Sequence, residues 1–209
     1  DAVTDRSGIT GEKMELDGYN WIEGAATAIY NHQGKNALCT IAAFNKPADE
    51  KVAHEIVMQI AAMNPIAIDE DGVSEEIKQK EIQVAIDKTK AEQVQKAVEA
   101  ALKKAGFNLY IAENEEHLNE GVMKGNITEA QAEEIRQLKA KVAEEKAANL
   151  PAAMIENIAK GRLGKFLKEV CLLKQEDIMD PKKTVADVLK ESDPELKVVD
   201  FKRFTLRAE

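Results

Sequence analysis

The fold is decided by residues 74–105, which read SEEIKQKEIQVAIDKTKAEQVQKAVEAALKKA. Apolar residues recur there at a strict spacing of seven, with three more beside them: Ile77, Val84, Ala91, Val98 and Ala105, joined by Val94, Ala101 and Leu102. On a background of Lys, Glu and Gln, this repeat predicts one long helix with a single apolar stripe. At ~1.5 Å per residue the helix is about 45–50 Å long, so its stripe needs a second helix as a partner.

More helical segments follow in the same region. A short helix is expected around residues 115–124, and Thr128 is placed to cap a longer one. The apolar face of that longer helix holds Ile135, Leu138 and Val142. Pro151 suits the first turn of a last helix. We therefore predict that residues 74–167 form a long antiparallel helical coiled-coil arm with an elaborated tip.

The segment before the arm predicts a β-hairpin and a helix. Residues 21–30 and 37–44 are apolar runs that a short turn at residues 32–35 separates, which is typical of a hairpin. Asp49 is placed to cap a helix over residues 50–63. By contrast, residues 1–15 carry little local signal beyond two turns that contain glycine.

The segment after the arm predicts two more strands, over residues 169–173 and 197–207, and a short helix that Thr184 and Asp187 cap. Aromatic residues lie on both sides of the arm, which indicates that the two flanks share one core: Tyr19, Trp21, Tyr30 and Phe44 before it, Phe201 and Phe204 after it. The predicted fold class is α+β. Its core is an antiparallel sheet with packed helices, built from residues 18–73 and 168–209 and interrupted by the arm.

Composition excludes several functional classes. The net charge of −9 over 209 residues disfavours a protein that binds nucleic acid directly, because phosphate neutralisation needs concentrated Lys and Arg. No apolar run is long enough to cross a membrane. Cys39 and Cys171 are too few and too far apart for a disulfide scaffold or a zinc site, so a reduced, cytoplasmic setting is expected.

No catalytic or metal-binding pattern emerges. His32, His54 and His117 lack ligand spacing, so no metal or cofactor is predicted. Residues 161–165, Gly-Arg-Leu-Gly-Lys, lack the residue order of a phosphate-binding loop, and the two glycines are expected to allow close approach to a partner helix. Paired glutamates on the arm are typical of a solvated face. We predict that the chain is not an enzyme and has no catalytic residues.

Motifs along nearly the whole chain resemble a known family. They are Gly11-Glu12, Tyr30-Asn31-His32-Gln33-Gly34, QIAAMNP at 59–65, EIQV at 81–84, GRLGKFLKEVCL at 161–172 followed by Gln175, and Lys183-Thr184-Val185. In this order they resemble bacterial elongation factor Ts, the guanine-nucleotide exchange factor of elongation factor Tu. One departure is Gln175-Glu176-Asp177-Ile178, which stands where the family usually has Gln-Pro-Phe-Val.

The resemblance implies an organisation and a partner. The core would be similar to the dimerisation domain of elongation factor Ts, and residues 1–17 would be a remnant of the N-terminal core subdomain. The chain would be a C-terminal portion that lacks the ubiquitin-associated-type module and the Thr-Asp-Phe-Val segment. We expect it to bind elongation factor Tu in the GDP-bound or nucleotide-free state, and to exchange nucleotide weakly.

The resemblance also implies partner-binding residues. Gly11 and Glu12 match a loop near the partner's nucleotide domain, and His32 matches a residue that meets the partner's third domain. By itself, His32 reads as an exposed turn histidine. Arg162 and Lys165 are candidates to meet acidic partner surface, and a solvated helix face explains them equally.

Two other functions stay open. A coiled-coil-mediated structural or assembly protein would form a homodimer by pairing the apolar stripe of residues 74–105 between chains. A small hydrolase ranks far below the exchange factor and the assembly protein, because no nucleophile is paired with a base in any recognisable motif.

Overall fold

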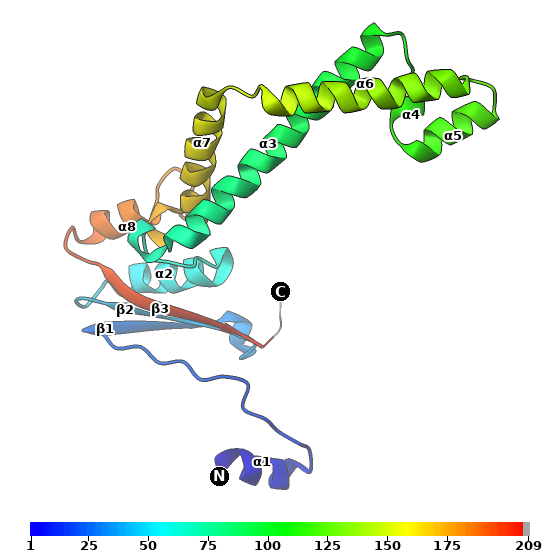
Figure 1. The fold of residues 1–209 in the computed structure, drawn as a ribbon. Coiled ribbons are helices and arrows are strands. Elements are labelled where there is room, and N and C mark those ends of the chain that lie inside the picture. Colours follow the sequence, from blue (N-terminus) through cyan, green and yellow to red (C-terminus); the bar gives the residue numbers. More distant parts are fainter. Residues whose placement is uncertain (207–209) are drawn as a thin grey trace. The chain divides into compact units, whose positions relative to one another are not determined.

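The structure, a computed structural model, describes residues 1–206 and divides into two units. The sheet unit contains Asp1–Ser74 and the chain from Lys165 onward, and the arm unit contains Glu75–Gly164. Within the described residues the fold is mixed α/β, with one three-stranded antiparallel sheet and eight α-helices (Figure 1). Arg207, expected at the end of the last strand, lies outside the described residues.

The sheet has the order β1-β2-β3, with β1 at Ala26–Asn31, β2 at Leu38–Phe44 and β3 at Val198–Thr205. Both strand pairs are antiparallel. The turn between β1 and β2 contains the short 3₁₀ segment η1, His32–Gly34. The predicted hairpin and final strand are confirmed, and the two flanks of the arm do meet in one sheet.

Helix α2, Glu50–Met63, covers one face of β1 and β2 (Figure 1). It begins where predicted, because the Asp49 carboxylate accepts hydrogen bonds from the backbone N–H groups of Lys51 and Val52. Its buried face joins β2, β3 and helix α8, Val185–Ser192, in one core that includes Phe44, Ile56, Val57, Ile60, Val185, Leu189 and Val198. The predicted capping box of Thr184 and Asp187 at the start of α8 is confirmed.

The predicted strand at residues 169–173 is wrong. Helix α7, Ala152–Val170, includes the first two residues of the predicted strand. A 3₁₀ turn, η3 at Leu172–Lys174, follows. The segment makes one isolated parallel bridge, between Ala67 and Cys171. A short apolar run alone does not distinguish a strand from the end of a buried helix. Here the helix of the preceding residues continues as far as Val170.

Residues 2–10 form a helix that the sequence did not predict. In α1, Ala2–Thr10, the Asp1 carboxylate accepts from the backbone N–H groups of Val3 and Thr4, and Gly11 ends the helix in the left-handed region at a φ of 71°. None of its residues is buried. The expected turn at Thr10-Gly11 is therefore a helix C-cap, and local capping forms this helix.

The arm unit is helical, with short loops. It contains α3 at Glu75–Lys104, α4 at Leu109–Ala112, α5 at Glu115–Met123, α6 at Glu129–Ala148 and the larger part of α7. The predicted cap at Thr128 is confirmed, and it is part of a capping box with Gln131. Helices α3 and α6 pack together, and with α4 and α5 they enclose a second core of Val98, Leu102, Ala112, Leu118, Ala132 and Ile135.

The apolar stripe of α3 is covered over only part of its length. Val98 is 7% exposed, whereas Val84 is 57% and Ile77 is 40% exposed. A straight helix drifts by about 20° for each seven-residue repeat, so residues spaced by seven leave the buried face after two or three repeats. The predicted helix is thus confirmed. Of the five residues spaced by seven, however, only Val98 is buried, so the prediction that they form the covered stripe is wrong.

The expected role of the two glycines in α7 is also wrong. A Cβ atom built at Gly161 or Gly164 meets no heavy atom within 4 Å. These glycines therefore do not mark a close helix contact, and they lower helix propensity without a packing benefit. A third short 3₁₀ turn, η2 at Glu70–Gly72, lies just before the arm unit.

Candidate functional site

His32 lies at the exposed hairpin turn and contacts a tyrosine of β1. The Tyr30 hydroxyl and the Nδ1 atom of His32 are 2.9 Å apart, and the two rings meet edge to face with centroids 5.8 Å apart. The Tyr30 ring also meets His54 of α2 edge to face, at 5.7 Å. Tyr30 thus connects the turn to the helix that covers the sheet.

A shallow hollow of about 350 Å³ adjoins His32. Its lining comes from β1, β2, α2, β3 and the loop after α7: Tyr30, Leu38, Met58, Ala61, Ala62, Asn64, Ile178 and Arg203. Two of the lining residues are alanines, and the Arg203 Nε atom donates to the Ala61 carbonyl oxygen at 3.3 Å. A hollow that is lined by apolar side chains and a few polar groups can receive an apolar side chain of a partner protein.

Ile178, which lines this hollow, is held by a buried polar cluster that positions the loop after α7. Gln59 of α2 donates to the Gln175 side chain and to the Glu176 carbonyl oxygen, both at 3.1 Å, and accepts from the backbone N–H of Ile178 at 2.9 Å. These bonds hold Ile178 against α2. This cluster could not be predicted from the sequence, because a glutamine in a helix gives no signal of burial.

Asp177 is the unusual member of this loop. It is 2% exposed, and its Oδ2 atom accepts from the backbone N–H groups of Met179 at 3.0 Å and Asp180 at 2.7 Å. Its buried Oδ1 atom has no hydrogen-bond donor among the described residues. The pKa of Glu55 is raised, first by burial and then by its interaction with Asp177, so a proton on Glu55 would supply the missing donor.

Gly11 and Glu12 lie beyond the end of α1. The backbone N–H of Gly11 donates to the Ser7 carbonyl oxygen at 2.9 Å, and its φ of 71° suits glycine. Glu12 is exposed, and its backbone N–H approaches the Thr10 hydroxyl at 3.4 Å. The loop therefore has a defined conformation and presents a carboxylate to solvent.

The two basic candidates of α7 differ in their surroundings. The Arg162 Nη2 atom donates to the Glu81 Oε2 atom at 2.8 Å, and both side chains are partly buried. This ion pair joins α7 to α3 within the arm unit. Lys165 is exposed and lies 3.9 Å from the Glu169 carboxylate. Arg162 thus has a close, partly buried carboxylate partner, whereas Lys165 is exposed and its carboxylate partner is more distant.

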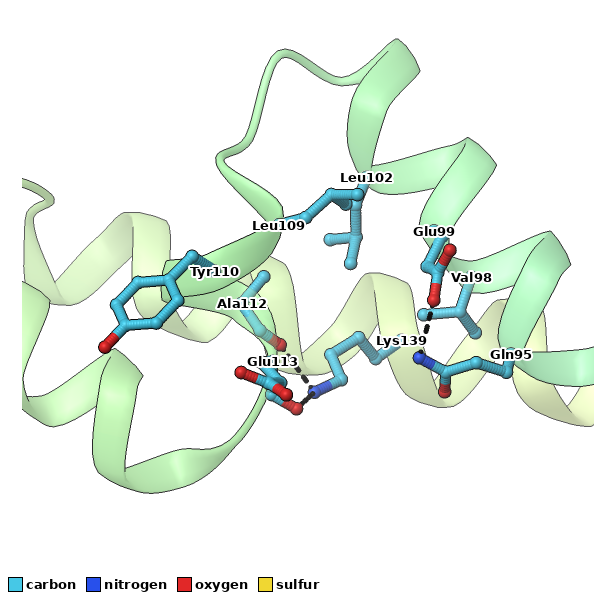
Figure 2. Close-up of a pocket in the computed structure, with 9 residues that line it drawn as sticks. All are labelled: Gln95, Val98, Glu99, Leu102, Leu109, Tyr110, Ala112, Glu113 and Lys139. Atoms are coloured by element: carbon cyan, nitrogen blue, oxygen red, sulfur yellow. Dashed lines mark hydrogen bonds between the residues drawn. The ribbon is translucent and has the colours of Figure 1, made fainter.

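A hollow of about 280 Å³ in the arm unit is lined by residues of α3, α4 and α6 (Figure 2). Figure 2 shows the Lys139 Nζ atom directed at the end of α4, where it donates to the carbonyl oxygens of Ala112 at 2.7 Å and Glu113 at 3.1 Å. On the opposite side, Gln95 donates to Glu99 at 2.9 Å. Because the Lys139 ammonium satisfies helix-end carbonyls, its role here is structural.

Residues 1–206 show no sign of a metal site or a membrane-spanning helix. That range contains no group of three or more His, Cys, Asp or Glu side chains that could hold a metal ion. Its two cysteines, Cys39 and Cys171, are not joined in a disulfide. The described helices include none that is long and apolar enough to cross a membrane.

Comparison with known proteins gives a consistent result. The family model described as Elongation factor TS matches residues 1–208. Elongation factor Ts of Bacteroides fragilis is 67% identical over 208 residues, and that of Phocaeicola vulgatus is 70% identical over 209 residues. Both alignments cover 100% of this chain and 63% of the relative. Elongation factor Ts of Porphyromonas gingivalis is 34% identical, with 56% of its length covered. The chain thus spans less than two-thirds of the length of these relatives.

Proposed function

Because the chain belongs to the elongation factor Ts family, we propose that it binds elongation factor Tu and promotes the release of GDP from it. The observation that carries this proposal is the match of the family model over residues 1–208. The surface agrees with it: His32 lies on an exposed turn beside a shallow hollow, where a partner protein can reach it.

The proposed mechanism is thermodynamic linkage and needs no covalent step. A protein that binds nucleotide-free elongation factor Tu more tightly than the GDP-bound form weakens GDP binding by the same factor. No catalytic side chain, metal or cofactor is required for this effect, and a cytoplasmic setting follows from the partner. We propose that the sheet unit, through His32 and the loop of Gly11 and Glu12, supplies the docking surface.

We further propose that the sheet unit is the dimerisation-domain-like core of this family and that the arm unit is its coiled-coil insertion. The packing of α3 against α6 and the ion pair between Glu81 and Arg162 support the second statement. Lys165 is one of three exposed lysines of α7, with Lys160 and Lys168, and it is the one that we assign to acidic partner surface. We expect weak exchange by the 209-residue chain, because the Thr-Asp-Phe-Val segment does not occur in it.

Calorimetric titration of the chain into nucleotide-free elongation factor Tu tests the proposal. We expect binding, and we expect His32→Ala to weaken it. The control is His117→Ala, because His117 stacks on Tyr110 in the arm unit and belongs to no proposed contact. No binding at tens of micromolar would overturn the proposal. Release of a fluorescent GDP analogue from elongation factor Tu then measures exchange, and rapid release would contradict the expected weak activity.

The second candidate function is assembly of a homodimer through the arm. It is favoured by the uncovered part of the α3 stripe, where Ile77 and Val84 are exposed. Sedimentation velocity over a concentration series separates the two functions. A chain that stays monomeric up to 100-fold above the concentration of the binding assay would exclude an obligate dimer, whereas Val84→Asp would dissociate a real one.

A further inference from the structure

The hydroxyl group of Tyr30 has no described hydrogen-bond partner other than the His32 ring. The Tyr30 ring is anchored, because Tyr30 lies in β1 opposite Thr40, packs against the buried core of the sheet unit and meets His54 of α2. His32, by contrast, is exposed at the turn. The anchored Tyr30 hydroxyl therefore holds the Nδ1 atom of His32. Without this bond, the exposed His32 side chain would sample several rotamers.

The bond to Tyr30 has a chemical consequence for His32. In a neutral imidazole one ring nitrogen carries the proton and the other accepts, and the partner of one nitrogen sets the role of the other. When the Tyr30 hydroxyl donates to Nδ1, the proton of the ring resides on Nε2. The exposed edge of His32 then presents an N–H donor, which fits a carbonyl or carboxylate oxygen of a partner.

We propose that Tyr30 is a positioning residue, which holds His32 as the Nε2–H tautomer in one orientation for contact with elongation factor Tu. This inference rests on the proposed function for its partner, but the tautomer and orientation of His32 are properties of the free chain. The ligand chemistry is an oxygen acceptor on the partner surface that meets His32.

The hairpin turn itself does not depend on Tyr30. The Asn31 side chain accepts from the backbone N–H of Asn36 at 3.0 Å and closes the turn, and Gln33 and Gly34 adopt left-handed φ angles of 54° and 66°. Tyr30→Phe removes only the hydroxyl and keeps the ring contacts with His32 and His54. The variant therefore tests the hydrogen bond while the fold of the hairpin is retained.

The direct test is nitrogen-15 NMR of the histidine rings in the free chain, at a pH where they are neutral. In the parent we expect an acceptor-type shift for His32 Nδ1 and a protonated-type shift for Nε2. In Tyr30→Phe we expect both His32 shifts to move towards an average of two tautomers, with His117 as the unchanged internal reference. A His32 proton on Nδ1 in the parent, or unchanged His32 shifts in the variant, would overturn the proposal.

The functional test is a double-mutant cycle on binding to elongation factor Tu. Freezing one side chain before binding is worth roughly 3- to 10-fold in affinity, which is the expected loss for Tyr30→Phe. In the His32→Ala background the same change should have no effect, because its target is gone. An equal loss in both backgrounds would assign Tyr30 a direct contact and overturn the positioning role. If the chain fails to bind at all, the proposed function fails, and the NMR result still decides the tautomer.

Discussion

Replacement of Asp177 by Asn should stabilise the sheet unit at pH 8 and have little effect at pH 4.5. The reason lies in the Oδ1 atom, which is buried and has no donor among the described residues, whereas Oδ2 accepts two backbone N–H groups. An asparagine can keep the acceptor that faces Met179 and Asp180, and it replaces the unsatisfied oxygen with an NH₂ donor. That donor suits the ionised carboxylate of Glu55.

The pH dependence follows from Glu55, whose pKa is raised above its ordinary value of 4.5, first by burial and then by Asp177. Lys51 and Lys183 also face it and oppose the shift. Because the folded state holds this proton more tightly than the unfolded chain, the parent loses stability as the pH rises from about 4.5 through the folded pKa. At low pH the protonated Glu55 can donate to Asp177, and the substitution then gains little.

A buried polar atom without a partner costs about 1–3 kcal/mol, so Asp177→Asn should raise the free energy of unfolding by about that much at pH 8. Urea unfolding followed by the amide NMR signals of β1, β2 and β3 reports on the sheet unit. Asp17→Asn, at an exposed position, is the control for the change in net charge. Equal or lower stability of Asp177→Asn at pH 8, relative to the parent, would refute this account of the pair.

Three further predictions concern packing and helix propensity. Ile60→Ala should destabilise the sheet unit by about 2–5 kcal/mol in urea unfolding, because Ile60 is fully buried, whereas Ile29→Ala, at a position 70% exposed, should cost far less. Leu102→Ala should lower the thermal midpoint of the arm unit's helical circular dichroism, and Val84→Ala should leave it nearly unchanged; equal shifts would contradict the observed covering of α3. Gly161→Ala and Gly164→Ala should each stabilise α7 by about 0.5–1 kcal/mol, since an added Cβ meets nothing within 4 Å; a loss of stability would reveal a contact at these glycines.

Helix boundaries were predictable where a side chain next to the helix determines them. Asp49, Thr128 and Thr184 each accept hydrogen bonds from the first turn of the helix that follows, as their sequence positions indicate. The hairpin was predictable for the same reason, because a short turn that contains glycine separates two apolar runs. Such features depend on a few neighbouring residues, so one sequence is enough to find them.

Features that depend on distant residues could not be predicted. The segment around Cys171 is apolar enough for a strand, and its backbone does bond to residues 67 and 68, but one bridge does not make a ladder. The seven-residue stripe of α3 was found, but the packed face of α3 follows the helical period of about 3.6 residues, so most positions spaced by seven lie outside that face. Among the candidate site residues, Arg162 was predicted either to meet a partner surface or to lie on a solvated helix face. Its ion-pair partner, Glu81, lies 81 residues earlier in the chain, so local sequence could not reveal the pair.

The departure from the family pattern at Asp177 lies beside the hollow that His32 adjoins. Ile178, the next residue, lines that hollow, and its backbone N–H is held by Gln59 of α2. A change in the bonding of Asp177 therefore acts on the wall of the candidate docking surface as well as on stability. If Asp177→Asn changes affinity for elongation factor Tu in the same pH range in which it changes stability, the Glu55–Asp177 pair and the docking surface are coupled through this loop. If only stability changes, the loop serves the core alone, and Tyr30 and His32 act independently of it.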